Sequence, residues 1–576
     1  MSPSATGVGR DTDAHPPVRS GPSRFCLWHN PSVCSVFSVV NLCRIIQRQM
    51  PLLPTFPMKT PRFVPALVVC SVALRTLSAA LGAEPAPAPV GQFAQQADVG
   101  GPEIAGSTTY DPGVQSYRMT ASGINLWASS DQFQFAWNRL KGDFILRARI
   151  AFVGQGVDPH RKLGWMVRTS LDPDSAYADA CVHGDGLTSL QFRRTKGAAT
   201  EQVVLEIKGG DVIQLERRGH TFIFSSAHYG QPFVSAELAE IDLGDEVNAG
   251  LFLCSHNAKV KEEAVFRDVR VIRPVKVGFQ PYHDYIGSRL EILNVFTGQL
   301  EQIHASAEPF EAPNWMPDGR TLIYNVSGAG PAKGVLRTFD LTNGTVAPLD
   351  TGFAVHNNND HVLSFDGKQL AISNHSSDDS GRSVVFTLPS SGGTPKRITA
   401  NSPSYLHGWS TDAQWLVYTG GRKETPGGPD KYDIYKIPSA GGTEVRLTTT
   451  PGLSDGPEFS PDGKYIYFNS TRTGLMQLWR MKTDGSDQEQ LTNDEFNSWF
   501  PHLSPDGKWI AFLSFDKAVR PDDHPYYKHV YLRLMPAAGG PARVIAYVYG
   551  GQGTINVPSW SPDSTRIAFV SNTGDF

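Results

Sequence analysis

The chain has few cysteines and lacks the spacing that structural zinc sites require. It has 6 cysteines in 576 residues, none of them in a Cys-x-x-Cys pair. No segment carries a sustained 3.6-residue hydrophobic period, which excludes a solenoid of helical repeats. The net charge is −4, and no dense block of Lys and Arg occurs after residue 92. Nucleic acid is therefore not an expected partner.

Motifs of nucleotide chemistry are also missing. The stretch 550–558 is rich in glycine, but neither Gly-Lys-Ser/Thr nor a helical pattern follows it. Kinase and NAD-binding motifs are absent, and we expect no serine hydrolase. These absences leave open whether the chain is an enzyme.

No hydrophobic run is long enough to cross a bilayer. The apolar stretch at 63–74 has 12 residues, follows Lys59 and Arg62, and precedes small residues. This order predicts a signal peptide at 58–83, cleaved between Ala80 and Ala83. We therefore expect an exported protein, periplasmic or extracellular, with no transmembrane span in the mature chain. We further expect 1–57 to be a disordered extension upstream of the true start, and 84–91 to be a flexible mature N-terminus.

What the chain does have is a repeated phrase in its C-terminal half. The clearest copies read FSPDGKYIYF at 459–468, LSPDGKWIAF at 503–512 and WSPDSTRIAF at 560–569, with weaker copies at 315–324, 363–372 and 409–418. The aspartates of successive copies are 44 to 57 residues apart, which is the length of one four-stranded blade. These aspartates are Asp318, Asp366, Asp412, Asp462, Asp506 and Asp563. The repeats predict a six-bladed β-propeller.

The phrase itself predicts a tight turn between two strands. Pro presets φ, Asp bonds the backbone just ahead of it, and Gly accepts positive φ. The last copy ends close to the C-terminus, so its blade lacks outer strands. Two strand-like runs at 289–295 and 299–305 precede the first copy, and we expect them to complete the sixth blade. Such closure removes exposed sheet edges.

These repeats resemble those of the TolB-type propellers. The resemblance rests on the Ser-Pro-Asp-Gly turns and on phrases such as SSGGTPKRIT at 390–399 and SAGGTEVRLT at 439–448. It implies the fold over 286–576. It implies little about function, because such propellers include protein-docking envelope components, peptidase side domains and polysaccharide lyases.

The segment 92–273 alternates strand-like runs with turns, as antiparallel sandwiches do. Five phrases in order, among them LKGDFILRARI at 140–150 and GLFLCSHN at 250–257, resemble the concanavalin-type jelly roll of secreted lectins and glucanases. That resemblance implies a sugar site, for which Trp127 and Asp131 are the candidates, although Trp127 also fits the core. Cys181 and Cys254 fit a disulfide and two buried thiols equally well. The stretch 274–285 reads as a linker.

Propellers bind ligands at the mouth of the central channel, and the segments just before the six turns are unusually polar. In these segments one recurring position is polar or aromatic, and another is Pro or His. The candidate binding residues are Glu311, His356, Asn359, Asp360, His361, Tyr405, His407, Asp455, Trp499, His502 and Asn556. A polar loop at 522–529, assigned to the sixth blade, is read either as solvated or as functional.

Three of these histidines, His361, His407 and His502, form a candidate metal set for Mn, Zn or Ca. The residue types resemble the metal centre of oligogalacturonate lyase propellers. A polar site without metal and a purely structural role are the alternatives.

The sequence therefore predicts an all-β chain: an antiparallel jelly-roll β-sandwich followed by a six-bladed β-propeller closed by both ends of the domain. The expected function is binding of a glycan or a cell-envelope protein at the channel mouth. The alternative is a carbohydrate-active enzyme, a metal-assisted lyase or hydrolase, with its site in the channel.

Overall fold

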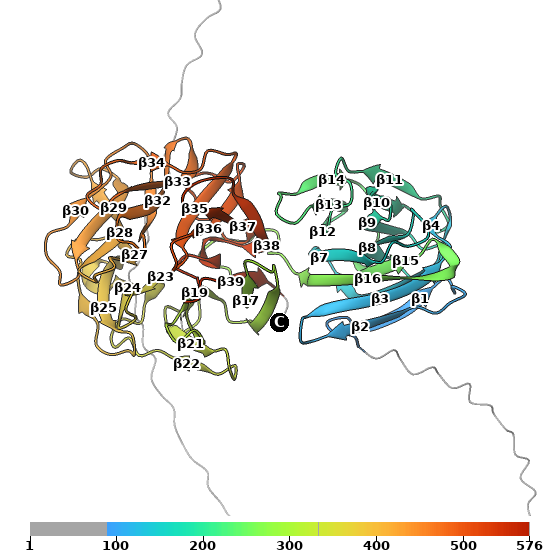
Figure 1. Cartoon of the computed structure of the whole chain (residues 1–576), viewed down its shortest axis with the longest axis horizontal. Coiled ribbons are helices and arrows are strands. Elements are labelled where there is room, and N and C mark those ends of the chain that lie inside the picture. The colour runs from blue at the N-terminus through green and yellow to red at the C-terminus, as the bar shows by residue number, and fades with distance from the viewer. Residues whose placement is uncertain (1–88, 332, 575–576) are drawn as a thin grey trace, which may run out of the picture. The chain divides into compact units, whose positions relative to one another are not determined.

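The computed structural model describes residues 89–331 and 333–574 (Figure 1). The predicted extension at 1–57 and the signal peptide at 58–83 lie outside these residues, as does most of the predicted flexible segment 84–91. Strands make up nearly all regular structure, and the two short 3₁₀ turns are η1 (Ser377–Asp379) and η2 (Gln552–Thr554). Within the described ranges, no helix is long and apolar enough to cross a membrane.

The first part of the chain folds into two seven-stranded antiparallel sheets. In order across the first sheet, the strands are β1 (Gln95–Val99), β6 (Phe133–Lys141), β15 (Glu246–Cys254), β8 (Lys162–Arg168), β9 (Tyr177–His183), β10 (Thr188–Arg193) and β11 (Glu201–Val204). The second sheet contains β14 (Val234–Leu238), β13 (Thr221–Ala227), β12 (Val212–Arg218), β7 (Phe144–Val153), β16 (Asn257–Ile272), β3 (Ser116–Gly123) and β2 (Ser107–Asp111).

One hydrophobic core joins these two sheets. Trp165 and Leu251 of the first sheet and Leu215 and Phe266 of the second belong to the same buried cluster. Burial of the inward side chains along each strand supplies most of the stability of such a pair of sheets. The all-β, antiparallel prediction is confirmed for this part, whereas its assignment as a concanavalin-type jelly roll stays a prediction.

Cys181 and Cys254 are both buried free thiols. They lie in a second cluster, with Phe135 and Trp137, on the first sheet. Their role is that of small apolar side chains, which decides between the two interpretations that the sequence left open.

The second part is a propeller of six antiparallel blades. The first three are β19 (Phe310–Trp315) to β22 (Val346–Pro348), β23 (Asn357–Leu363) to β26 (Lys396–Arg397), and β27 (Ser404–Trp409) to β30 (Val445–Arg446). The next two are β31 (Ser454–Phe459) to β34 (Glu489–Gln490) and β35 (Phe496–Leu503) to β38 (Arg543–Gly550). Between these bounds lie β20 (Thr321–Val326), β21 (Leu336–Asp340), β24 (Gln369–Ser376), β25 (Arg382–Pro389), β28 (Trp415–Lys423), β29 (Asp430–Pro438), β32 (Tyr465–Thr473), β33 (Leu475–Lys482), β36 (Trp509–Asp516) and β37 (Lys528–Pro536).

The sixth blade confirms the predicted closure by both ends of the domain. Strand β39 (Arg566–Thr573) pairs with β17 (Gly287–Asn294), which in turn pairs with β18 (Leu300–Ser306). An isolated bridge between Trp560 and Ile567 supplies the inner edge. The first and last strands of the propeller are therefore hydrogen-bonded neighbours, and the ring has no open seam between them.

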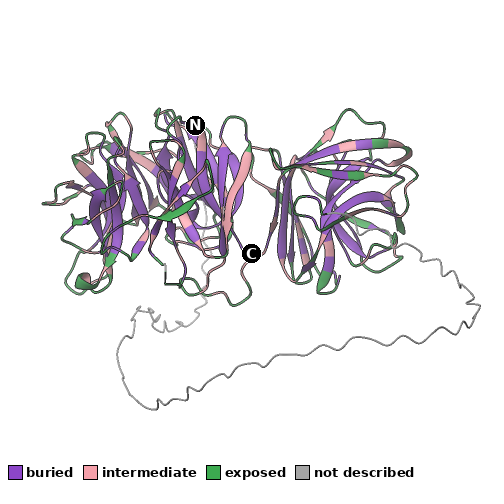
Figure 2. Ribbon diagram, turned by 90° about the horizontal axis from the view of Figure 1, so that it is seen from below, coloured by how far each residue is buried: buried purple, intermediate pink, exposed green. Residues whose placement is uncertain are grey.

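The aspartate of each repeat stabilises its turn as predicted. In the fourth copy, Asp462 accepts hydrogen bonds from the Ser460 hydroxyl at 2.7 Å and from the Lys464 amide at 3.1 Å. The same pair of bonds recurs at Asp366, Asp412, Asp506 and Asp563. Figure 2 shows that the strands are mostly buried and that exposed residues gather in the turns and loops.

Ala413 and Ser564 stand where other copies have Gly, yet they adopt the same backbone conformation. Their φ angles are 56° and 60°, compared with 70° at Gly463. The turn hydrogen bonds persist, with Ala413 N to Ser410 O at 2.9 Å. These turns therefore keep the geometry of the Gly copies, and the left-handed strain is retained.

Candidate functional site

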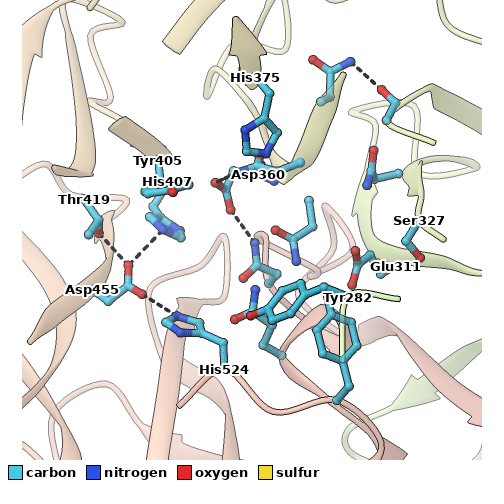
Figure 3. Close-up of a pocket in the computed structure, with 18 of the residues that line it drawn as sticks. Tyr282, Glu311, Ser327, Asp360, His375, Tyr405, His407, Thr419, Asp455 and His524 are labelled. Carbon is cyan, nitrogen blue, oxygen red and sulfur yellow. Dashed lines mark hydrogen bonds and ion pairs between the residues drawn. The ribbon is translucent and has the colours of Figure 1, made fainter. Parts of the chain in front are cut away.

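A cavity of about 740 Å³ opens where the inner strands of the blades converge (Figure 3). Its wall draws side chains from β19, β23, β27, β31 and β35 and from the segment that follows β38. Eight of the predicted residues line it: Glu311, His356, Asn359, Asp360, Tyr405, His407, Asp455 and Asn556.

A bulge at the same place in the inner strands explains why these side chains face inward. The pairing register shifts between Glu311 and Asn314 in β19 and between Asp455 and Glu458 in β31, and β23, β27 and β35 shift at matching points. A bulge bends its strand and re-aims a side chain. Ala312 and Gly456, which follow the two carboxylates, both adopt φ near 60°.

Three predicted residues do not line the cavity. Trp499 is 1% exposed and packs in the hydrophobic core, because the bulge in β35 turns the next residue, Phe500, into the cavity instead. Phe500 stacks on His407 with ring centroids 5.8 Å apart. His361 is fully buried, and burial lowers its pKa to about 4.

His502 is the third, and its position corrects the candidate metal set. Both its ring nitrogens are already bonded, Nδ1 to Glu458 at 2.8 Å and Nε2 to the Ile555 carbonyl at 2.6 Å. Of the set, only His407 lines the cavity. The residues that the structure describes contain no group of three or more His, Cys, Asp or Glu side chains that could hold a metal.

Asp455 is the most strongly bonded group of the cavity wall. Its Oδ1 accepts from the Thr419 hydroxyl at 2.6 Å and the Gly456 amide at 2.8 Å, and lies 3.3 Å from His407 Nε2. Its Oδ2 lies 3.1 Å from His524 Nε2. Figure 3 shows the carboxylate between the two rings.

These hydrogen bonds determine the charges of Asp455 and His407. Burial would raise the pKa of Asp455, but the hydrogen bonds with His407 and His524 outweigh it and hold the pKa well below its usual range. Burial also opposes the charged form of His407, but Asp455 and Asp360 outweigh it and raise the pKa of that imidazole. Asp455 and His407 therefore form a buried ion pair at the cavity wall.

Two other carboxyl groups face the cavity without a cationic hydrogen-bond donor. Asp360 accepts from the side-chain amides of Asn358 at 2.8 Å and Asn556 at 2.7 Å, and burial raises its pKa. Burial also raises the pKa of Glu311, to about 7, against a hydrogen bond with Asn359 that lowers it. Glu311 thus changes its protonation state near neutral pH.

Sequence reasoning missed one whole side of the cavity. Tyr282 and Tyr285 lie in the stretch predicted to be a linker, and His524 and Tyr526 lie in the loop 522–529. That loop joins β36 to β37, so it belongs to the fifth blade rather than the sixth. Asp522, in the same loop, also lines the cavity. The signal that could have found the rest is the density of tyrosines in two supposed loops.

The chain contains one Gly-x-Ser-x-Gly stretch, at 452–456, which is the sequence pattern of a serine hydrolase. Its Ser454 is fully buried in β31 and shares a hydrogen bond of 3.1 Å with the Ser470 hydroxyl. No helix follows it, so the strained strand-to-helix elbow of a nucleophilic serine is not formed.

The predicted sugar site of the first part is not assembled as the sequence suggested. Asp131 is fully buried, and Arg193 donates to both its oxygens at 2.8 and 2.9 Å, while Arg168 lies 3.5 Å away. Its oxygens are therefore engaged inside the protein. Trp127, by contrast, is 39% exposed in the short hairpin of β4 (Leu126–Trp127) and β5 (Ser130–Asp131), so it is not a core residue.

Comparisons with known proteins agree with the propeller. The TolB beta propeller domain family matches residues 424–521. The uncharacterized protein Atu1656 of Agrobacterium fabrum is 44% identical over 285 residues, which are 49% of this chain and 92% of that protein. A solved structure assigned as TolB from Agrobacterium tumefaciens is 42% identical, with 50% of this chain and 99% of that chain covered and a TM-score of 0.46.

Similarity to curated TolB proteins is more limited. The Tol-Pal system protein TolB of Bordetella pertussis is 40% identical over 55 residues, 9% of this chain and 13% of that protein. The extent and identity of the match to Atu1656 are decisive for classification. Through its propeller, the chain belongs to the family of TolB-like β-propeller proteins that includes Atu1656.

Proposed function

We propose that this is a binding protein whose channel-mouth cavity takes a hydroxyl-rich small molecule, such as the end of a glycan. The observation that carries the proposal is the cavity itself. Its volume of about 740 Å³ lies within the range of small-molecule sites, and its wall combines carboxylates, side-chain amides and tyrosines.

The polar groups of this wall suit hydroxyl recognition because they are held in place. Asp360 is positioned by two side-chain amides, so its remaining lone pairs accept from a ligand without reorganisation. Asp455 is held by four donors, among them the rings of His407 and His524, which also line the cavity. Tyrosine rings offer the apolar faces on which sugar rings stack. A concave polar site of this kind fits a small ligand better than the broad surface of a docked protein.

An envelope location is part of the proposal. It is supported by the signal peptide predicted at 58–83 and by similarity to proteins named Tol-Pal system protein TolB. A glycan exposed in the envelope or outside the cell is then the available ligand.

The test is to titrate the purified full-length mature chain with a panel of oligosaccharides and to measure the binding affinity by calorimetry. Asp360→Asn replaces a carboxylate oxygen, which accepts hydrogen bonds, by an NH₂ group, which would face the amide donors of Asn358 and Asn556. We therefore expect the affinity for the glycan to fall at least tenfold. Asp378→Asn is the matched control, because Asp378 lies in η1 and does not line the cavity, so this variant should bind as the wild type does. Absence of binding to every glycan, or equal binding by both variants, would disprove the proposal.

A carbohydrate-active enzyme is the second candidate, favoured by one observation. Glu311, with its pKa near 7, can donate a proton, while Asp455 remains ionised in the same cavity. Carboxyl groups whose pKa values are separated in this way serve as acid and as base or charge stabiliser in glycoside hydrolysis. Appearance of shortened oligosaccharides that stops in Glu311→Gln would support this function, and unchanged ligand after prolonged incubation would exclude it for that glycan.

A further inference from the structure

Three tyrosines stand together at the cavity wall, and we call them the tyrosine cage: Tyr282, Tyr285 and Tyr526. The ring of Tyr526 is 5.1 Å from that of Tyr282, with an interplanar angle of 81°. It is 6.1 Å from that of Tyr285, at 90°. The rings are therefore packed edge to face, and all three line the same cavity.

The faces of aromatic rings carry negative partial charge, so a cation is attracted to a space between them. Tyr282 is 59% exposed although it is a large aromatic residue, so it is available to a ligand. Burying such a side chain against its neighbours would be the ordinary outcome in a folded protein. Its exposure at the rim of a cavity is what a recognition role requires.

Glu311 adjoins this cage. It lines the same cavity as the three tyrosines, and Figure 3 shows it beside Tyr282. Burial raises the pKa of each tyrosine, and the negative charge of Glu311 adds to that rise. Among the described residues, no Lys, Arg or His forms an ion pair with Glu311. Lys333, an exposed residue, attracts it without such a pair, and Asp360 repels it.

We propose that the tyrosine cage and Glu311 form a subsite for an alkylammonium group, so that the ligand is a hydroxylated amine such as an amino sugar. This deepens the proposed function and rests on it. The cage supplies cation–π attraction, the carboxylate supplies the counter-charge, and Asp360 adds a second negative charge nearby.

The same arrangement disfavours an acidic sugar. A uronate carboxylate placed at the cage would meet the carboxyl group of Glu311 in a partly desolvated cavity, where like charges repel. Of the cationic groups that also line the cavity, Lys333 is exposed and His407 is already paired with Asp455. The ligand class implied by the cage is thus the opposite of the uronate class suggested by the resemblance to oligogalacturonate lyases.

The first experiment compares three trisaccharides by calorimetry with the full-length mature chain: a chitosan trisaccharide with free amines, its fully N-acetylated form, and trigalacturonate. We expect the free amine to bind about tenfold more tightly than the acetylated form, and trigalacturonate to bind weakest. Tyr282→Ala should remove the preference for the amine, while Tyr282→Phe, which keeps the ring face, should retain it. Because Tyr282 is exposed, neither variant threatens the fold. Equal affinity for the amine and the acetylated sugar, or preference for the acid, would overturn the subsite.

A second probe separates the subsite from the glycan function. Choline carries a permanent charge and no sugar, so it tests the cage alone. At pH 7 its binding should release about half a proton per site, because a cation favours the ionised form of Glu311. Glu311→Gln should abolish both the release and most of the affinity.

The outcomes are distinguishable. Sugar binding that depends on Asp360 but shows no amine preference would overturn the cage and leave the proposed function standing. Choline binding that depends on Glu311, with no sugar bound, would support the cage and overturn the glycan function. Failure of choline and of all three sugars to bind would overturn both.

Discussion

Gly553 lies directly against the carboxyl side chain of Glu311. A Cβ atom at position 553 would lie 1.8 Å from Glu311 Oε2 and 2.7 Å from Glu311 Cβ. The second contact is with the root of the side chain, so Glu311 cannot avoid it by changing its terminal rotamer. The absence of a side chain at 553 is therefore what allows Glu311 to occupy its place in the cavity wall.

Gly553→Ala should displace Glu311 and reduce ligand affinity at least tenfold. We expect a loss of stability of about 1 to 3 kcal/mol, the usual cost of an overpacked site. Gly330→Ala is the control, since a Cβ there meets no atom within 4 Å, and its effect should stay within about 0.5 kcal/mol. Calorimetry measures the ligand affinity of each variant, and urea unfolding measures its stability. Wild-type affinity in Gly553→Ala would show that the position of Glu311 is immaterial.

Glu311→Gln should stabilise the protein at alkaline pH. The pKa of Glu311 is raised from 4.5 to about 7, so below pH 4.5 the carboxyl is protonated in both the folded and unfolded states. Between 4.5 and 7 the unfolded state ionises first, which destabilises the folded state, and above 7 that penalty is complete. We expect the variant to be about 1 to 2 kcal/mol more stable than the wild type at pH 8 and equal to it at pH 4. Urea unfolding at both pH values measures this, and a difference independent of pH would contradict it.

Asp455→Asn should reduce the stability of the folded protein most at mildly acidic pH. The lowered pKa of Asp455 stabilises the folded state above pH 3.8, and that contribution disappears as the pH falls. The raised pKa of His407 stabilises it below pH 6.5, and that contribution disappears as the pH rises. The pair therefore contributes most between about pH 4 and 6.5, where we expect the substitution to cost about 2 to 3 kcal/mol.

Thr419→Val is the matched control for this pair. It removes the 2.6 Å hydrogen bond to the same Asp455 oxygen but leaves the charges. We expect a loss of about 1 kcal/mol that is the same from pH 4 to 8. Parallel pH profiles for the two variants would show that Asp455 and His407 are not charged together.

Ala413→Gly should stabilise a blade turn, whereas Gly507→Ala should destabilise one. Ala413 is held at φ 56°, a conformation that costs a residue with a Cβ about 1 to 2 kcal/mol. Glycine relieves this but gains entropy in the unfolded state, so we expect a net gain of about 0.5 kcal/mol. Gly507 has φ 71° and open space around it, so its substitution isolates the strain and should cost about 1 kcal/mol. Loss of stability in Ala413→Gly would refute this account of the turn.

Asp131→Ala should destabilise the first part of the chain by about 3 to 5 kcal/mol. It would leave two fully buried guanidinium groups, Arg168 and Arg193, without their carboxylate. Trp127→Ala, at an exposed position in the adjoining hairpin, should cost about 1 kcal/mol. Guanidinium unfolding followed by circular dichroism compares the two. A small effect at Asp131 would restore it as a candidate for ligand binding.

The features that the sequence predicted correctly depend on neighbours in the chain. The Ser-Pro-Asp-Gly turn is made by bonds between residues two to five positions apart, as between Ser460 and Asp462, so it can be read wherever the phrase occurs. The period of the turns predicts the blades. The strand-like runs at 289–295 and 299–305 belong to none of the other five blades, and they complete the sixth. Repetition also predicted which strand positions face the channel, which is why Glu311 and Asp455 were identified.

Residues of the inner strands were predicted wrongly where a single step of the backbone mattered. In β35 the bulge exchanges Trp499 for Phe500 at the cavity wall, and a shift of one residue reverses the face of a strand. His502 and His361 shared the residue type of His407 but not its surroundings. Their burial and partners depend on adjacent blades, which one repeat does not encode.

The sequence alone determined the architecture of the propeller, because hydrogen-bonded turns and alternating strands are local and recur six times. Only the tertiary structure decided the chemistry of the cavity. Tyr282 and Tyr526 are far apart along the chain and in segments without a repeat. Their rings meet only when the propeller brings the segment before β17, in the sixth blade, next to the β36–β37 loop of the fifth blade. The burial that moves the pKa of Glu311 to about 7 is likewise a property of the assembled wall, since desolvation depends on every atom around a group and not on its neighbours in sequence.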